Sequence, residues 1–184
     1  MKKIFLGVLT SLLILGLSGC VGASYDIAPS SKEEVSQNIT VNYDKFKKQT
    51  WISTPSYLIR DGFTDTFPVV ASYRALYKDN KLEFIQLYLK ISGTEWAFFN
   101  QAVGEDGYSF EFLKIDKDVN VISGGGQAMA IVKEHVALSV PLTQLKKMAS
   151  QDYEIKIYGK RREGIFNMPK IISAAFFQKL QSIN

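Results

Sequence analysis

The chain contains one histidine and one cysteine, so few residues could serve in nucleophilic catalysis. A Ser-His-Asp site would have to use His135, and no Gly-x-Ser-x-Gly turn presents a serine to it. Polar and apolar residues alternate over 128–140, and His135 shares its face with Lys133 and Ser139. We therefore expect a histidine at or just beneath the surface, and we assign no catalytic residue.

Glu134 falls on the opposite, apolar face of the same stretch, between Val132 and Val136. A carboxylate in such a position is costly unless it is paired or reaches water. Two interpretations stay open. Either a strand end, a bulge or an edge hydrates the side chain, or Glu134 forms a structural ion pair with a basic residue of a later hairpin. The candidate partners for that pair are Lys156, Lys160, Arg161 and Arg162.

Lys160-Arg161-Arg162 is the densest basic cluster after the first few residues. One interpretation is a solvated hairpin tip. The other is a binding surface for anionic lipid headgroups or an acidic partner, where each basic residue contributes about 1 kcal/mol. We retain these three residues as the candidate binding site.

Metal and cofactor sites are not expected. Zinc sites need clusters of Cys and His, which the chain lacks. Asp116, Asp118 and Asn120 match the start of a calcium loop, but Val121 stands where that loop needs glycine, so we interpret the segment as a polar turn. The run 124–126 of three glycines is not followed by the Gly-Lys-Ser/Thr of a phosphate-binding loop.

Paired carboxylates across a cleft would allow glycoside hydrolysis, and the chain has many acidic residues. Their spacing selects no pair. A small carboxylate-dependent envelope hydrolase therefore remains the alternative to a protein that is not an enzyme.

Strands dominate the elements that must position these residues. Ser31-Lys32-Glu33-Glu34 has the form of a capping box and predicts a helix over 31–37. Pro141 and Pro169 predict helices over 142–149 and from 170 to about 181. Alternating and β-rich segments predict strands, most of them joined by short polar turns, over 39–43, 51–59, 69–77, 81–91, 95–103, 108–115, 128–140, 153–158 and 164–168. The expected fold class is α+β, a mainly antiparallel sheet or sandwich with the C-terminal helix packed on it.

The first twenty residues form a separate pattern. Lys2 and Lys3 precede an apolar run over 4–17, and Leu17-Ser18-Gly19-Cys20 follows. The run has 14 residues, whereas a spanning helix needs roughly 20. The pattern resembles the lipobox signal of bacterial lipoproteins. That resemblance implies a signal peptide over 1–19, lipidation of Cys20, a short spacer over 20–29 and one globular domain over 30–184. An uncleaved anchor helix remains the alternative.

Lipoproteins retained at the inner membrane commonly have Asp after the lipidated cysteine, and here that position is Val21. The same resemblance therefore implies that the protein is located at the outer membrane and faces the periplasm. A location on the surface of a Gram-positive cell remains the alternative. Segments 134–136 and 153–161 are similar to those of uncharacterised small bacterial lipoproteins, a resemblance that implies no activity, cofactor or catalytic residue. Removal of Lys2 and Lys3 lowers the net charge from +4 to +2, too little to favour nucleic acid. We expect a membrane-anchored, non-enzymatic protein that binds or supports an envelope protein or glycan. Acylated Cys20 would attach it to the membrane lipid.

Overall fold

The computed structural model describes residues 28–60, 67–124 and 127–183. The expected signal peptide, Cys20 and most of the spacer lie outside these ranges. The described elements are, in chain order, α1 (Lys32–Gln37), β1 (Thr40–Asp44), β2 (Gln49–Ser53), β3 (Tyr57–Arg60), β4 (Val69–Lys78), β5 (Lys81–Gly93), β6 (Phe99–Gly104), β7 (Ser109–Gly124), β8 (Gln127–Ser139), α2 (Leu142–Met148), β9 (Tyr153–Gly159), β10 (Glu163–Met168) and α3 (Lys170–Gln181).

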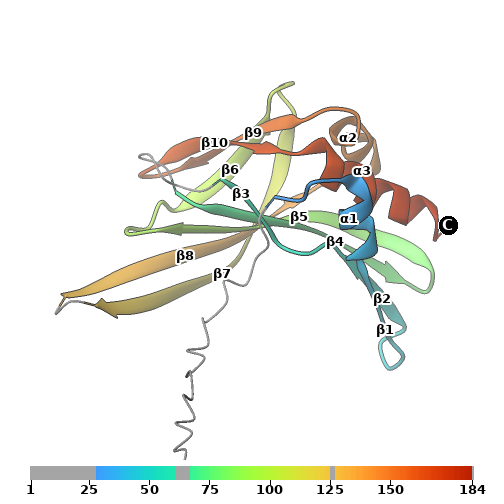
Figure 1. Ribbon diagram of the computed structural model, residues 1–184, viewed down its shortest axis with the longest axis horizontal. Helices are drawn as coiled ribbons and strands as arrows, with labels where there is room; N and C mark the ends of the chain where they lie inside the picture. Colours follow the sequence, from blue (N-terminus) through green and yellow to red (C-terminus); the bar gives the residue numbers. More distant parts are fainter. Residues whose placement is uncertain (1–27, 61–66, 125–126, 184) are drawn as a thin grey trace, which may run out of the picture.

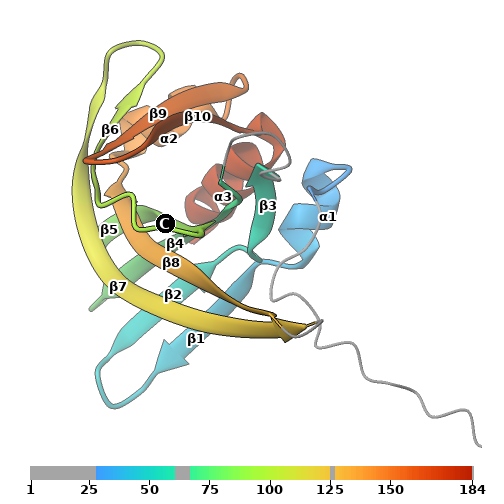
Figure 2. The ribbon, with the colours of Figure 1, turned by 90° about the vertical axis from the view of Figure 1, so that its left-hand side faces the viewer.

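The described strands form one antiparallel sheet in the order β1-β2-β4-β5-β8-β7-β6-β9-β10, with β3 added beside β4. The sheet curls, so that β9 and β10 lie on one side of α3 and β4 and β5 lie on the other (Figures 1 and 2). The sheet does not close on itself, because β3 and β10 are not paired. The expected α+β class, with a mainly antiparallel sheet and a packed C-terminal helix, is confirmed.

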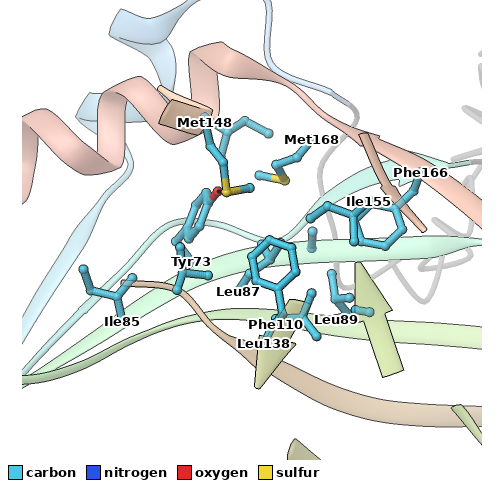
Figure 3. Packing of buried hydrophobic residues seen from close by; sticks show 14 of the residues in the cluster. Tyr73, Ile85, Leu87, Leu89, Phe110, Leu138, Met148, Ile155, Phe166 and Met168 are labelled. Carbon is cyan, nitrogen blue, oxygen red and sulfur yellow. Dashed lines mark hydrogen bonds between the residues drawn. The ribbon is translucent and has the colours of Figure 1, made fainter. Parts of the chain in front are cut away.

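The core fills the space inside the curl. Figure 3 shows Met148 of α2 and Ile155 of β9 facing Tyr73 and Leu87 of the β4–β5 pair. The ring of Tyr73 stacks on Phe176 of α3 with 5.1 Å between the ring centres. Because these side chains are fully buried, the C-terminal helix is an integral part of the core.

Local signals set several of these elements. Ser31 accepts the main-chain N–H of Glu34 at 3.1 Å, which confirms the predicted helix start. Asp79 and Asn80, with φ of 48° and 62°, form the tight turn between β4 and β5, and these residue types tolerate left-handed backbone. The predicted strand 51–59 is instead divided into β2 and β3 around Pro55, which has no N–H for a ladder.

The predicted turn between β6 and β7 is also present, and it is tied to α2. Asp106 accepts the main-chain N–H of Tyr108 at 3.0 Å, the hydroxyl of Tyr153 and the ammonium of Lys147 at 2.6 Å. A methyl group added to Gly104 would overlap that Tyr153 hydroxyl. The close fit holds the hairpin against the helix.

Candidate functional site

The described part of the sheet splits where β6 leaves β7. These two strands pair only through Ala102 with Phe110 and Val103 with Ser109. Beyond that point β6 pairs with β9, and β7 pairs with β8. A pocket of about 320 Å³, which we call the wedge pocket, lies in the split and is lined by Phe98, Phe99, Lys114, Ile115, Asp116, Lys117, Glu134, His135 and Val136.

Glu134 fixes one wall of the wedge pocket. Its side chain is 4% exposed, so it is buried and does not reach water at a strand end. Oε1 accepts the N–H groups of Ala97 at 2.7 Å and Phe98 at 2.9 Å, and Oε2 accepts that of Phe99 at 3.1 Å. Both interpretations that the sequence left open, a hydrated side chain and an ion pair with a basic residue of the late hairpin, are therefore wrong: the partners of Glu134 are backbone amides. Charge-assisted hydrogen bonds of this kind offset the loss of hydration.

Ala97, Phe98 and Phe99 form a backbone anion nest around that carboxylate. Phe98 has a φ of 57°, a left-handed conformation that is rare for a bulky residue. Such a conformation costs on the order of 1–3 kcal/mol and needs surrounding contacts to persist. Successive N–H groups in this geometry converge on one anion, and here that anion is Glu134. The nest therefore holds the Phe98 ring at the pocket.

Cationic side chains gather on the same ring. The ammonium of Lys117 lies 4.6 Å from the ring centre of Phe98 and 5.1 Å from that of Trp96. The guanidinium of Arg161 lies 5.4 Å from the Phe98 ring centre. In the described ranges neither cation, nor Lys114, has a carboxylate within ion-pair distance.

The predicted basic cluster is thus placed beside the pocket. Lys160 and Arg161 are exposed and Arg162 is half-buried. The turn is not a free tip, because the N–H of Arg161 donates to Ala97 O at 3.1 Å and that of Lys160 to Phe98 O at 3.4 Å. Sequence reasoning missed Phe98, Lys117 and their contact with this turn, and no local pattern marks them.

His135 occupies the outer face of the sheet. Its side chain is 11% exposed, which agrees with the predicted polar face. Nδ1 lies 2.6 Å from the hydroxyl of Tyr88. Nε2 lies 3.0 Å from Oδ2 of Asp118 but is not hydrogen-bonded to it. Arg74 covers the Tyr88 ring at 4.6 Å. Asp118 lies in β7, which continues where we expected a polar turn.

This outer cluster brings a hydroxyl, an imidazole and a carboxylate together, as in a nucleophilic site, but the imidazole and the carboxylate are not hydrogen-bonded. Burial raises the pKa of the Tyr88 hydroxyl, against the opposing effect of Arg74, and so disfavours the phenolate. On the outer face the cluster therefore holds one hydrogen bond, between Tyr88 and His135, with Asp118 close to the other ring nitrogen. Alternation in 81–91 is the sequence signal that separates Tyr88 from the inward-facing residues of β5.

Carboxylates that line the wedge pocket do not face each other. Asp116 is registered with His135, and Glu134 with Lys117, on neighbouring positions of the β7–β8 pair. Adjacent strand positions point to opposite faces of a sheet. Asp116 and Glu134 therefore do not form a pair across the pocket.

Within residues 28–60, 67–124 and 127–183, no group of three His, Cys, Asp or Glu side chains could hold a metal ion. The same ranges contain no helix that is long and apolar enough to cross a bilayer. The chain matches no protein-family model, no curated protein and no solved structure. Function must therefore be argued from the geometry of the site.

Proposed function

We propose that this protein is a lipid-anchored, non-enzymatic envelope protein that binds an anionic amphiphile of the envelope in the wedge pocket. The observation that supports this is one site with apolar walls and unpaired cations. Phe98, Phe99 and Val136 supply the apolar surface, and Lys117 lines the same pocket. Arg161 adds a second positive charge beside the Phe98 ring.

The size of the wedge pocket suits a small ligand or part of a larger one. Its volume of about 320 Å³ lies at the lower end of the range of roughly 300–1,000 Å³ for ligand sites. Apolar walls with a few polar groups that fix orientation are typical of such sites. A cation over an aromatic face remains available to an anion, because the ring provides no competing carboxylate.

The proposed anchor would place the site near its ligand. Acylated Cys20 lies eight positions before Ala28, the first described residue. An extended chain of that length spans at most about 30 Å. The globular domain would then remain close to the bilayer, on our proposal the outer membrane facing the periplasm. An envelope amphiphile in that membrane would be within reach of Lys117 and Arg161.

The hydrolase alternative receives less support. A glycosidase pair needs two carboxyl groups that flank the substrate, roughly 5 to 10 Å apart. Glu134 uses both oxygens on backbone amides, and Asp116 points to the other face of the sheet. Binding requires neither group to be free, so the geometry favours binding over hydrolysis.

A lipid titration tests the proposal. The chain, purified from membranes in neutral detergent, is titrated with short-chain phosphatidylglycerol, which is anionic, and with phosphatidylcholine, which is not. Trp96 contacts Lys117 and reports binding by fluorescence in a Trp51→Phe background. We expect saturable binding of phosphatidylglycerol and no saturable binding of phosphatidylcholine. The double variant Lys117→Glu with Arg161→Glu should lower the affinity for phosphatidylglycerol at least tenfold.

A charge-matched control is Lys47→Glu with Lys81→Glu, two exposed lysines in the other half of the sheet, one in the turn between β1 and β2 and one at the start of β5. This variant should bind as the wild type does. Equal affinity for the two lipids, or equal losses in the two double variants, would overturn the proposed ligand class.

A further inference from the structure

The β7–β8 hairpin extends beyond the rest of the described sheet (Figure 1). β5 pairs with β8 only as far as Gly93 opposite Val132, whereas β7 and β8 remain paired out to Gly124 opposite Gln127. β6 covers the other edge of β7 only up to Phe110. We call residues 119–124 and 127–131 the arm. Neither of its edges pairs with another described strand.

The arm has a surface that is unusual for solvent. No Asp, Glu, Lys, Arg or His occurs between Asp118 and Lys133. Val119, Val121 and Met129 are 56%, 65% and 53% exposed. Natural sheets protect long free edges with charges, prolines or a covering element, and the arm has none of these in the described ranges. A two-stranded ribbon is also marginally stable alone.

We propose that two copies of this chain associate through the β7 edges of their arms. The strands would run antiparallel around a twofold axis perpendicular to the sheet, and the two arms would form one four-stranded sheet. Such an interface uses the same surface on both copies. New main-chain hydrogen bonds satisfy the free edge, which a lipid surface cannot do because hydrocarbon offers no hydrogen-bonding group.

The arm sequence is self-complementary in one register. With Asn120 opposite Asn120 of the second copy, Val119 faces Val121 on both sides of the axis. A twofold axis perpendicular to the sheet leaves the same face of both arms on the same side. Val119 and Val121 of both copies would therefore form one apolar strip, together with Val132, which is opposite Val119 in the β7–β8 pair. The two amides can hydrogen-bond to each other. A shift of the axis to Asp118 would instead place two carboxylates in direct opposition, which is destabilising.

Disulfide capture tests this register on the full chain in neutral detergent. Opposite positions in an antiparallel pair have Cβ atoms about 4.5–5.5 Å apart, close enough for a disulfide after small adjustments. Asn120→Cys should give a covalent dimer under mild oxidation. Met129→Cys, exposed on the other strand of the arm, is the matched control and should crosslink at least tenfold more slowly. The wild-type chain controls for crosslinks through Cys20.

Light scattering of the same preparations gives an independent measurement. The wild type should dimerise with concentration, and Val121→Lys should remain monomeric at the same thermal stability. Val41→Lys, at an exposed position of β1, should dimerise like the wild type. A wild type that is monomeric throughout, equal crosslinking at 120 and 129, or a Val121→Lys effect confined to lipid-vesicle binding would each overturn the proposal.

Discussion

The main-chain N–H of Phe98 lies 2.9 Å from Oε1 of Glu134, and this contact joins a left-handed residue to a buried carboxylate. The two residues come from different halves of the curled sheet, β8 and the segment that leads into β6. The Glu134 carboxylate therefore joins β8 to the segment before β6, and both of these parts line the wedge pocket.

Glu134→Ala should lower the free energy of unfolding by about 3 kcal/mol or more, because it leaves two buried N–H groups and one half-buried N–H group without an acceptor. Glu134→Gln keeps one acceptor oxygen and should lose less. The neighbouring Lys133→Ala, on the opposite face, should cost under about 1 kcal/mol. Urea unfolding of the three variants measures the difference, and equal losses at 133 and 134 would contradict the role of the nest.

Asp106 should make stability depend on pH in the acid range. Loss of hydration raises the pKa of Asp106, but hydrogen bonds from Lys147, Tyr153 and the Tyr108 N–H outweigh it and hold the pKa well below its usual value. The contribution is present above the unfolded pKa of about 3.9, and it is lost as the pH falls from there through the folded pKa.

Asp106→Asn should therefore be less stable than the wild type at pH 7, by about 1–2 kcal/mol, and the gap should narrow as the pH falls below about 4. Denaturant unfolding at both pH values gives the comparison. A gap of the same size at pH 7 and pH 3 would show that ionisation of Asp106 is not the cause.

A side chain at position 104 should destabilise the fold, because the hydroxyl of Tyr153 occupies the space that it would need. Gly104→Ala forces a methyl group into the position of that hydroxyl, which is fixed by Gln144 at 2.7 Å and by Asp106. We expect a loss of about 1–3 kcal/mol, as for other overpacked sites. In a double-mutant cycle, part of the loss should disappear in Tyr153→Phe, and strict additivity would argue against the overlap.

Cys20→Ser tests the proposed anchor. Acyl chains on Cys20 would contribute about 0.8 kcal/mol for each buried methylene, so two chains make a stable attachment. The serine variant should leave the membrane fraction after a high-salt wash, and the wild-type chain should carry the acyl mass by mass spectrometry. An unmodified Cys20 thiol in the mature wild type would exclude lipidation.

Short-range patterns predicted most of the fold. Alternation and turn residues placed β4 and β5, and the proline-led helices α2 and α3 begin where expected. Tertiary pairing overrode local preference at Asp116 and Asp118, which are typical of turns but lie in β7 because β8 pairs with them.

The site was harder to predict. The alternation placed Glu134 on the apolar face but left open whether its side chain reaches water. The amides that donate to it lie 35 to 37 positions away in the chain. Backbone amides carry no sequence signature, and the left-handed Phe98 is a residue type that does not favour that conformation. A search among charged side chains for the partner of Glu134 could not have found them.

The unpaired junction between β3 and β10 has a consequence for how the molecule opens. Gly164 of β10 lies so close to Arg60 and Phe67 that a methyl group there would collide with both, yet no ladder joins the two strands. Separation along this seam breaks no β-ladder between the described strands. The curl can therefore loosen there while every β-ladder stays intact, and amide hydrogens along the outer edge of β10 should exchange with solvent well before those of β5.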